Sequence, residues 1–143
     1  MDRKDLTLLV IGAGGERGLS PVQLQKSVFL LTESGVPGLP ANGYKFTAYN
    51  YGPFDADVYR DADALTAEGC VAKISLAGRS WKKYLITPTG ETRFKYLETS
   101  TRAPFQQFCH ETVTWVTSLS FNDLLRAIYA KYPAYRANSV FQG

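Results

Sequence analysis

Five carboxylates lie within the short stretch of residues 54–69, where Arg60 is the only cation. Paired carboxylates can serve as a general acid and a general base, but only where burial or a neighbouring charge shifts one pKa. The stretch shows no sign of a pocket that would do so. A helix face turned toward solvent, or toward a basic partner, explains the acid better than catalysis does. The five residues are Asp55, Asp57, Asp61, Asp63 and Glu68.

The next stretch, residues 70–102, has the opposite charge, with seven cations against two carboxylates. Its densest basic group surrounds a tryptophan. Cations on a projecting loop can contact phosphates or enter a minor groove of DNA, although basic side chains on a surface often serve only solubility. We interpret this group as contacts to double-stranded DNA, made by Arg79, Ser80, Trp81, Lys82 and Lys83.

A glycine-rich segment, VIGAGGERG, places Gly12 and Gly14 after an apolar run, as in the dinucleotide-binding pattern G-x-G-x-x-G. Arg17 stands where the third glycine belongs, and no acidic residue ends the next strand to hold a ribose. A flexible turn between two helices explains the glycines better. We therefore expect no cofactor.

The single histidine, His110, lies between Cys109 and Glu111 in a segment with helical periodicity. Adjacent residues on a helix point in different directions, so these three cannot form a nucleophile, a base and an orienting group. The other cysteine, Cys70, has no zinc-binding spacing to Cys109, and both lie in apolar surroundings. Buried thiols are the expected state, and neither an enzyme nor a metal site is predicted.

Helix signals are clearest at Ser20, which can cap a helix that begins at Pro21 and whose Gln23 completes a capping box. The apolar side chains of this helix are expected to face the core and to leave Gln23, Lys26 and Ser27 nearer to solvent. An earlier buried helix is predicted over residues 5–13, with a strand as its alternative because of its β-branched content.

Beyond this pair, residues 44–51 have the composition of a short strand, and Gly52 and Pro53 after it are predicted to form a turn. A third helix is predicted from about residue 54 to residue 68. Two β-rich runs separated by AGRS predict a hairpin, with Gly78 in its turn. Further helices follow from Pro88, and then over PFQQFCHETVTWV and SFNDLLRAIYAKY.

The order of helix, helix, strand, helix and hairpin predicts an α+β fold, specifically a winged helix-turn-helix core over residues 1–98. Residues 103–143 are predicted to form a two-helix C-terminal extension with apolar stripes of its own. Such stripes can bind a partner or a second copy, so a homodimer is expected. The longest apolar run is too short to cross a bilayer, and the expected location is cytoplasmic, without membrane attachment.

Three segments carry a family resemblance: LQKSVFLL, YNYGPFDADVYRDADAL and YLITPTGE. With the hairpin between the last two, they resemble bacterial winged-helix proteins, which include small transcriptional regulators and the SocA-like or Panacea antitoxin domain. The resemblance covers about residues 5–98, and the Tyr-Gly-Pro before the third helix is its most specific part. It implies a winged-helix fold and either operator binding or a protein-binding role as an antitoxin or adaptor.

The third helix separates these two functions. Its helical spacing turns Tyr59 and Arg60 outward, and arginine can grip guanine in the major groove. Together with Gln23 and Lys26 from the preceding helix, they are predicted DNA contacts of a transcriptional regulator. The alternative is an antitoxin-like or adaptor module, in which an acidic flank of the helix binds a basic protein partner through Asp57, Asp61 and Glu68.

Overall fold

The computed structural model describes residues 1–141. In that part of the chain it shows an α+β fold, with six α-helices and two small antiparallel sheets. The helices are α1 (Arg3–Ala13), α2 (Pro21–Ser34), α3 (Ala56–Ala67), α4 (Pro88–Ser100), α5 (Ala103–Ser118) and α6 (Phe121–Lys131). The sheets pair β1 (Thr47–Tyr49) with β2 (Gly52–Phe54), and β3 (Val71–Ser75) with β4 (Lys82–Ile86). Short 3-10 turns form η1 (Gly15–Arg17) and η2 (Pro133–Arg136).

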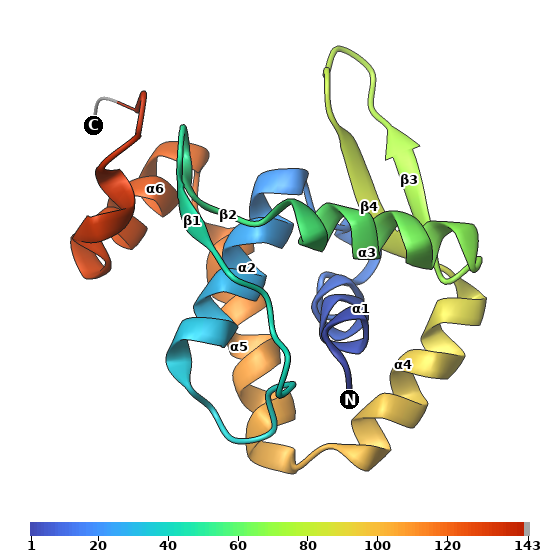
Figure 1. Cartoon of the computed structure of the whole chain (residues 1–143). Helices are drawn as coiled ribbons and strands as arrows, with labels where there is room; N and C mark the ends of the chain where they lie inside the picture. Colours follow the sequence, from blue (N-terminus) through green and yellow to red (C-terminus); the bar gives the residue numbers. More distant parts are fainter. Residues whose placement is uncertain (142–143) are drawn as a thin grey trace.

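Helix α1 lies at the centre, and helices surround it (Figure 1). Six consecutive residues, Leu6–Ile11, are buried, because α2, α3, α4 and α5 all pack against it. A helix enclosed on every side buries polar positions as well, and Thr7 is fully buried. The sequence therefore predicted the helix correctly, but it held no indication that every side of it would be covered.

The predicted capping box of α2 is confirmed. The Ser20 hydroxyl accepts a hydrogen bond from the Gln23 backbone N–H at 3.2 Å, and the Gln23 side-chain oxygen accepts from the Ser20 N–H at 2.9 Å. Pro21 occupies the first turn, where a backbone N–H would have no acceptor within the helix, so its missing N–H costs no hydrogen bond. Asp55 caps α3 in a similar way, by accepting from the Asp57 N–H at 2.8 Å, and α3 begins at Ala56 rather than at residue 54.

The hairpin β3–β4 projects from the helical body (Figure 1) and follows the predicted pattern, with Gly78 in its connecting turn at a positive φ of 75°. A third extended segment is attached to its base. The N–H of Leu19 donates to the Tyr84 carbonyl at 2.9 Å, and the N–H of Tyr84 donates to the Leu19 carbonyl at 2.8 Å. This close approach requires glycine at position 18, where a β-carbon would lie 2.7 Å from the Tyr84 carbonyl oxygen.

The second hairpin, β1–β2, contains the Tyr-Gly-Pro sequence and leads directly into α3. The sequence predicted only one short strand here and treated the glycine and proline as a turn. In the structure Gly52 pairs with Tyr49 and Pro53 pairs with Ala48, so the Gly-Pro pair belongs to the second strand. A proline is tolerated at this place because β2 is an edge strand of a two-stranded sheet.

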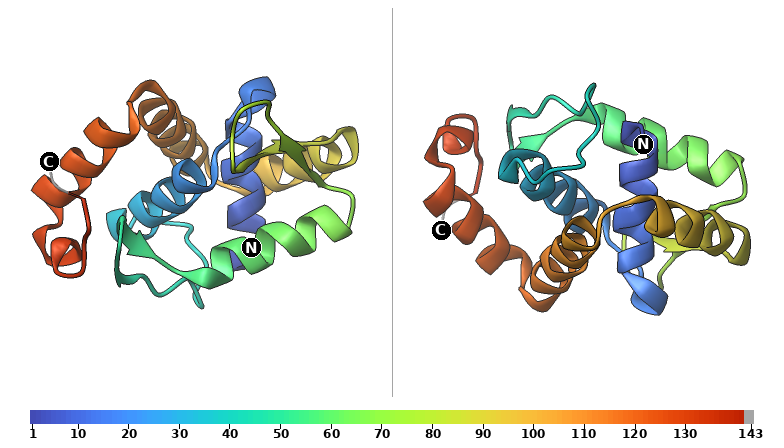
Figure 2. Two further views of the ribbon diagram at one scale, coloured as in Figure 1. Left: turned by 90° about the horizontal axis from the view of Figure 1, so that it is seen from above. Right: turned by 90° about the horizontal axis from the view of Figure 1, so that it is seen from below.

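Helices α5 and α6 bury their apolar stripes within the chain. Phe105, Cys109 and Val113 of α5 belong to the same core cluster as α1, while Leu124 and Ile128 of α6 belong to a smaller cluster around Phe29 of α2. Figure 2 shows α6 on the side of α2 away from the hairpin β3–β4, whereas α5 runs alongside α2 toward α1. The expected boundary near residues 98–103 falls at the α4–α5 connection, and the helices beyond it share buried side chains with those before it. The homodimer stays a prediction. The exposed apolar stripes that motivated it are buried within the chain.

No helix within the described residues is both long enough and apolar enough to cross a membrane. Both cysteines are buried free thiols, as expected. Gly12 lies inside α1 rather than in a flexible turn, and a β-carbon there would overlap the Phe94 ring of α4. That glycine therefore lets α4 pack closely on α1, whereas Gly15 and Gly18, both at positive φ, form the expected connection between α1 and α2.

Candidate nucleic-acid interface

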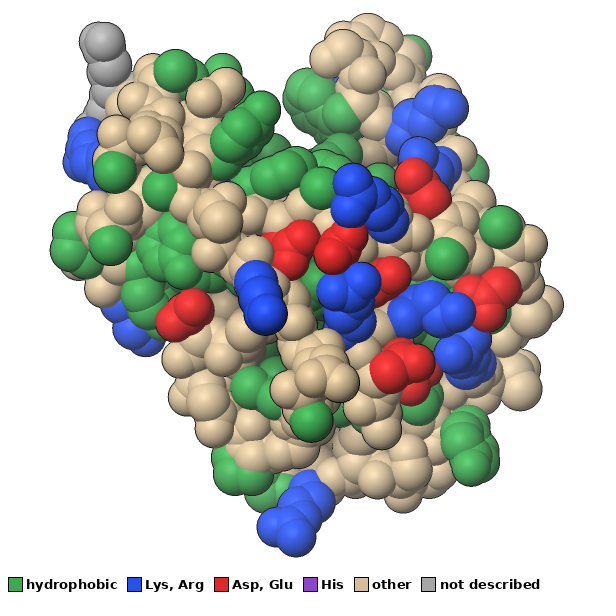
Figure 3. Space-filling view, in the orientation of Figure 1, with side chains coloured by type: hydrophobic (Ala, Val, Ile, Leu, Met, Phe, Trp, Pro, Cys, Tyr) green, Lys and Arg blue, Asp and Glu red, His purple; other side chains and the backbone are tan. Residues whose placement is uncertain are grey.

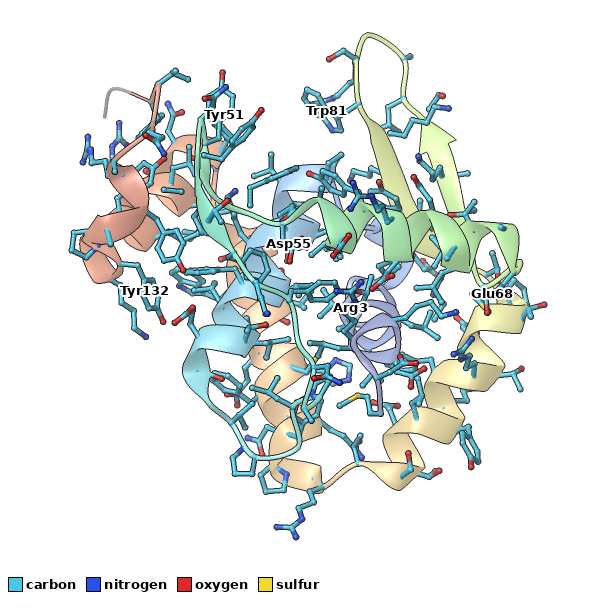
Figure 4. The ribbon with its side chains drawn as sticks, viewed as in Figure 1. Arg3, Tyr51, Asp55, Glu68, Trp81 and Tyr132 are labelled. Atoms are coloured by element: carbon cyan, nitrogen blue, oxygen red, sulfur yellow. The ribbon has the colours of Figure 1, made fainter. Side chains whose placement is uncertain are left out.

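The carboxylates of α3 are held by cations of neighbouring elements. The Arg3 guanidinium of α1 lies between two of them, 3.2 Å from Asp57 and 3.2 Å from Asp61. Figure 4 shows Arg3 below α3, directed toward it from the centre of the molecule. Asp57 also accepts from Arg60, and this hydrogen bond, together with the charges of both arginines, lowers the pKa of Asp57. The predicted acidic flank is therefore largely an ion-paired seam between α1 and α3.

Asp61 is the most enclosed member of this seam, with 17% of its side chain exposed. It accepts a 2.6 Å hydrogen bond from the Tyr44 hydroxyl, which in turn lies 2.6 Å from the hydroxyl of the buried Thr7. Burial and the bond to Asp61 raise the pKa of Tyr44, so its hydroxyl keeps the proton that it donates. The expectation of a solvated acidic face is wrong for Asp61, because its charge is part of the packing.

The remaining α3 acids also have partners. Glu68 lies 3.0 Å from Lys4 and 3.4 Å from Arg93, and a hydrogen bond from Lys4 is the largest of the effects that lower its pKa. Asp63 lies 2.9 Å from Lys73 of the hairpin. In Figure 3, cationic and acidic side chains alternate across this face of the molecule instead of forming an acidic patch. The strong charge asymmetry of the sequence is thus mostly cancelled in the fold.

On the outward side of α3, Arg60 is exposed as predicted, whereas Tyr59 is partly buried. The Arg60 side chain is 74% exposed, as the helical spacing predicts. Tyr59 is only partly exposed, because its ring stacks on Tyr84 of β4 with centroids 6.5 Å apart and meets Phe54 at 5.8 Å. Burial raises its pKa. Tyr59 therefore braces α3 against the hairpin, and Arg60 is the exposed side chain at the front of the helix.

The hairpin presents different side chains on its two faces. Lys73 lies opposite Tyr84, and Lys82 lies opposite Ser75, so these side chains share the face that meets α3. Trp81 and Lys83 alternate to the other face, where Lys83 donates to the Arg17 carbonyl at 3.0 Å. Arg79 lies over the Trp81 ring at 5.0 Å. Within residues 1–141, no carboxylate forms an ion pair with Arg79, Lys82 or Lys83.

Two predicted contacts come from α2, and one of them is wrong. Lys26 is only 3% exposed and donates to the Pro53 carbonyl at 2.9 Å. It cannot reach DNA, because the β1–β2 hairpin covers the side of α2 that was expected to face solvent. Ser27 beside it is fully buried, and its hydroxyl has no hydrogen-bond partner among residues 1–141. Burial lowers the pKa of Lys26 to about 8. Gln23 remains partly exposed, although its oxygen is used in the capping box.

Sequence reasoning missed a groove of about 840 Å³ between the hairpin β3–β4 and α6. Its floor is the first turn of α2, one wall is the hairpin, and the other is the β1–β2 turn with the start of α6. Tyr51 and Trp81 stand on opposite sides of it in Figure 4. No signal in the sequence pointed to it, because its aromatic residues belong to three separate predicted elements. The lining is Ser20, Pro21, Val22, Gln23, Tyr51, Leu76, Arg79, Ser80, Trp81, Lys83, Leu119, Phe121 and Leu124.

Neither protein-family models nor curated proteins match this sequence. Within the described part of the chain, no three His, Cys, Asp or Glu side chains are grouped so that they could hold a metal ion. His110 lies on the surface, 3.1 Å from Glu98, where its ring contacts Phe94 edge to face. Cys109 beside it is buried, and burial raises the pKa of its thiol to about 12. The candidate surfaces are therefore the front of α3, the hairpin and the groove.

Replacing Asp61 tests whether the acid of α3 is structural. Asp61→Ala leaves the Tyr44 hydroxyl and the Arg3 guanidinium without their shared acceptor, and we expect a loss of about 1–3 kcal/mol in the free energy of unfolding. Asp63→Ala, two residues away and exposed, should change it by less than about 0.5 kcal/mol. Urea unfolding of both variants decides the matter. Equal small losses would show that the seam contributes nothing to stability.

Lys26 generates a prediction about pH. The folded protein releases the Lys26 proton near pH 8, whereas the unfolded chain holds it to about pH 10.5. Between these values the unfolded chain binds more protons than the folded protein, so the free energy of unfolding rises as the pH rises through the window. Relative to Lys26→Met, the wild type should gain about 1 kcal/mol between pH 7 and pH 9. The wild type and Lys26→Met both contain Cys109, so the effect of this thiol on the pH dependence cancels from the difference between their unfolding free energies.

The matched control for this experiment is Lys45→Met, which changes an exposed lysine. Its unfolding free energy should follow that of the wild type at a constant offset over the same pH range. Urea titrations at pH 7, 8 and 9 supply the three curves. A Lys26→Met curve that also runs parallel to the wild type would show that the Lys26 ammonium is solvated in the folded protein.

Proposed function

We propose that this protein is a DNA-binding transcriptional regulator with a winged helix-turn-helix core, in which α3 enters a major groove and the hairpin β3–β4 is the wing. The order of helices, the projecting hairpin and the Leu19 segment paired with Tyr84 support this assignment. The resemblance of the Tyr-Gly-Pro segment to bacterial winged-helix proteins supports the proposed core and is compatible with either function. No catalytic group, cofactor or metal is part of the proposal.

The observation that carries the proposal is the internal pairing of the α3 acids. Unpaired, five carboxylates beside the groove-entering helix would repel phosphates and weaken binding to any duplex. In the fold, α1, α4 and β3 supply cations to four of them, from Arg3, Lys4, Arg93 and Lys73. The fifth, Asp55, accepts hydrogen bonds from the backbone N–H groups of Asp57 and Lys45. The front of α3 is then close to neutral, with Arg60 exposed on it. The wing adds Lys82, with which no carboxylate of residues 1–141 forms an ion pair.

The alternative of an antitoxin-like or adaptor module fits the acidic flank less well. Asp57, Asp61 and Glu68 would have to exchange intramolecular ion pairs for contacts to a basic partner, and Asp61 would also have to leave the Tyr44 hydroxyl. A partner would gain only the difference between two similar sets of interactions. The flank is therefore a weak candidate for a protein-binding surface, and the DNA interface is the better supported one.

A homodimer would increase the affinity of this interface. One small module neutralises few phosphates, whereas two wings joined in one particle double the electrostatic footprint and bind at a fixed spacing. We include dimerisation in the proposal for this reason alone, since α5 and α6 bury their stripes in the chain.

The wing gives the first test of DNA binding. If Lys82 contacts a phosphate, Lys82→Ala should reduce the slope of log affinity against log salt by about one unit per protomer on any duplex. Fluorescence anisotropy with a labelled 24-base-pair duplex at several salt concentrations measures it. Lys95→Ala, which removes an exposed cation from α4, is the control and should leave the slope unchanged. Identical slopes in both variants would remove the wing from the interface.

Arg60 gives the second test, which concerns specificity. On a duplex selected from a random pool by the wild type, Arg60→Ala should cost about 1–3 kcal/mol of binding free energy, because arginine reads guanine with two hydrogen bonds. Arg126→Ala is closely matched, since Arg126 is also exposed and paired with an aspartate three residues before it, but lies on α6. If the two variants bind the selected duplex equally, α3 is not the reading helix.

A further inference from the structure

The groove between the hairpin β3–β4 and α6 is not explained by DNA binding. In Figure 3 it is a notch at the top of the molecule, open to solvent, with hydrophobic side chains along its floor and sides. Its aliphatic lining comes from Val22, Leu76, Leu119 and Leu124. Monomeric proteins rarely leave such a continuous apolar surface uncovered unless it binds something.

Three large aromatic side chains border this groove and are unusually exposed. Tyr51 is 47% exposed, Trp81 is 41% and Phe121 is 41%. They come from the β1–β2 turn, the wing and the start of α6, which are far apart in sequence. Tryptophan, tyrosine and arginine are the residues that most often dominate the energetics of protein interfaces. The rim of the groove has this composition, because Arg79 lies against Trp81.

The groove also has a definite charge. Arg79 and Lys83 are among its lining residues, and no aspartate or glutamate is. Its floor is the first turn of α2, where the helix dipole adds partial positive charge. A basic segment would meet like charge here, whereas a segment with carboxylates would be attracted to the two cations on the wing side of the lining.

We propose that this groove binds a short acidic segment of a partner protein, whose bulky apolar side chains lie among Val22, Trp81 and Phe121 while its carboxylates meet Arg79 and Lys83. Single-stranded nucleic acid also combines stacking with cations, but it fits the aliphatic part of the lining poorly and would find only two cations. A segment that alternates acidic and apolar side chains uses both parts of the surface.

This inference is independent of DNA binding, although the two surfaces share the wing. Lys82 lies on the α3 face of the hairpin and Trp81 on the other, so each activity can be removed separately. Lys82→Ala should weaken DNA binding and leave the peptide site unchanged. Phe121→Ala should do the reverse, because α6 lies across the groove from the wing. A failure of one proposal therefore leaves the other measurable.

The test uses a phage-displayed library of random twelve-residue peptides, selected on the immobilised full chain. We expect the enriched peptides to combine Phe, Leu or Trp with an excess of Asp and Glu. Synthetic copies should bind at least tenfold more weakly to Trp81→Ala and to Phe121→Ala. Trp115→Ala is the matched control, since that tryptophan is also 41% exposed but lies on α5 outside the groove; its affinity should equal that of the wild type.

The two tryptophans of the chain provide a second readout. In Trp115→Phe only Trp81 emits, and the selected acidic peptide should shift its emission to shorter wavelength by removing it from water. In Trp81→Phe the remaining emission should not change. Enrichment of basic peptides, equal binding to the Trp81→Ala and Trp115→Ala variants, or a shift caused by a twelve-nucleotide oligothymidine and not by the peptide would overturn the proposal. Self-association of the chain that blocks the selected peptide would overturn it as well, by making a second copy the occupant.

Discussion

The guanidinium of Arg3 is the interaction on which the surface of this protein depends. It enters the seam between α1 and α3 and neutralises Asp57 and Asp61 together, at 3.2 Å from each. Helix α1 is enclosed by other helices along its apolar residues, so its polar first turn is the one part that can carry such a charge. Lys4 performs the same role for Glu68 at the other end of α3. The acids of α3 thus neutralise the two cations with which the central helix begins.

The consequence of this pairing is that linear charge patterns misrepresent the exposed surface. The acid of residues 54–69 and the base of residues 70–102 are largely paired with one another and with α1, through contacts such as Asp63 with Lys73 and Glu68 with Arg93. The tip and second strand of the wing, by contrast, keep cations that no carboxylate of residues 1–141 pairs with. The hairpin is therefore one of the surfaces that would attract a polyanion, and in the proposed interface α3 would add its shape and one arginine.

Local signals in the sequence were sufficient for most elements, because their causes are local. Ser20, Pro21 and Gln23 fix the start of α2 by hydrogen bonds within four residues, and Gly78 fixes the turn of the hairpin. Lys26 could not be placed in this way. Its burial depends on Pro53, twenty-seven positions away, and on a hairpin that the sequence showed only as a turn. The groove was equally out of reach, since Tyr51, Trp81 and Phe121 come together only when three elements are positioned.

The wing connects the two proposed activities through its strand geometry. Side chains alternate along β4, so Lys82 faces α3 while its neighbours Trp81 and Lys83 face the groove. A duplex on one face and an acidic segment on the other would both be attracted to the same short group of cations, and each would reduce the attraction felt by the other. The hairpin is held at its base, by Leu19 and by the stacking of Tyr59 on Tyr84, and is free at its tip. A protein partner and DNA would therefore compete through the charges of a single hairpin.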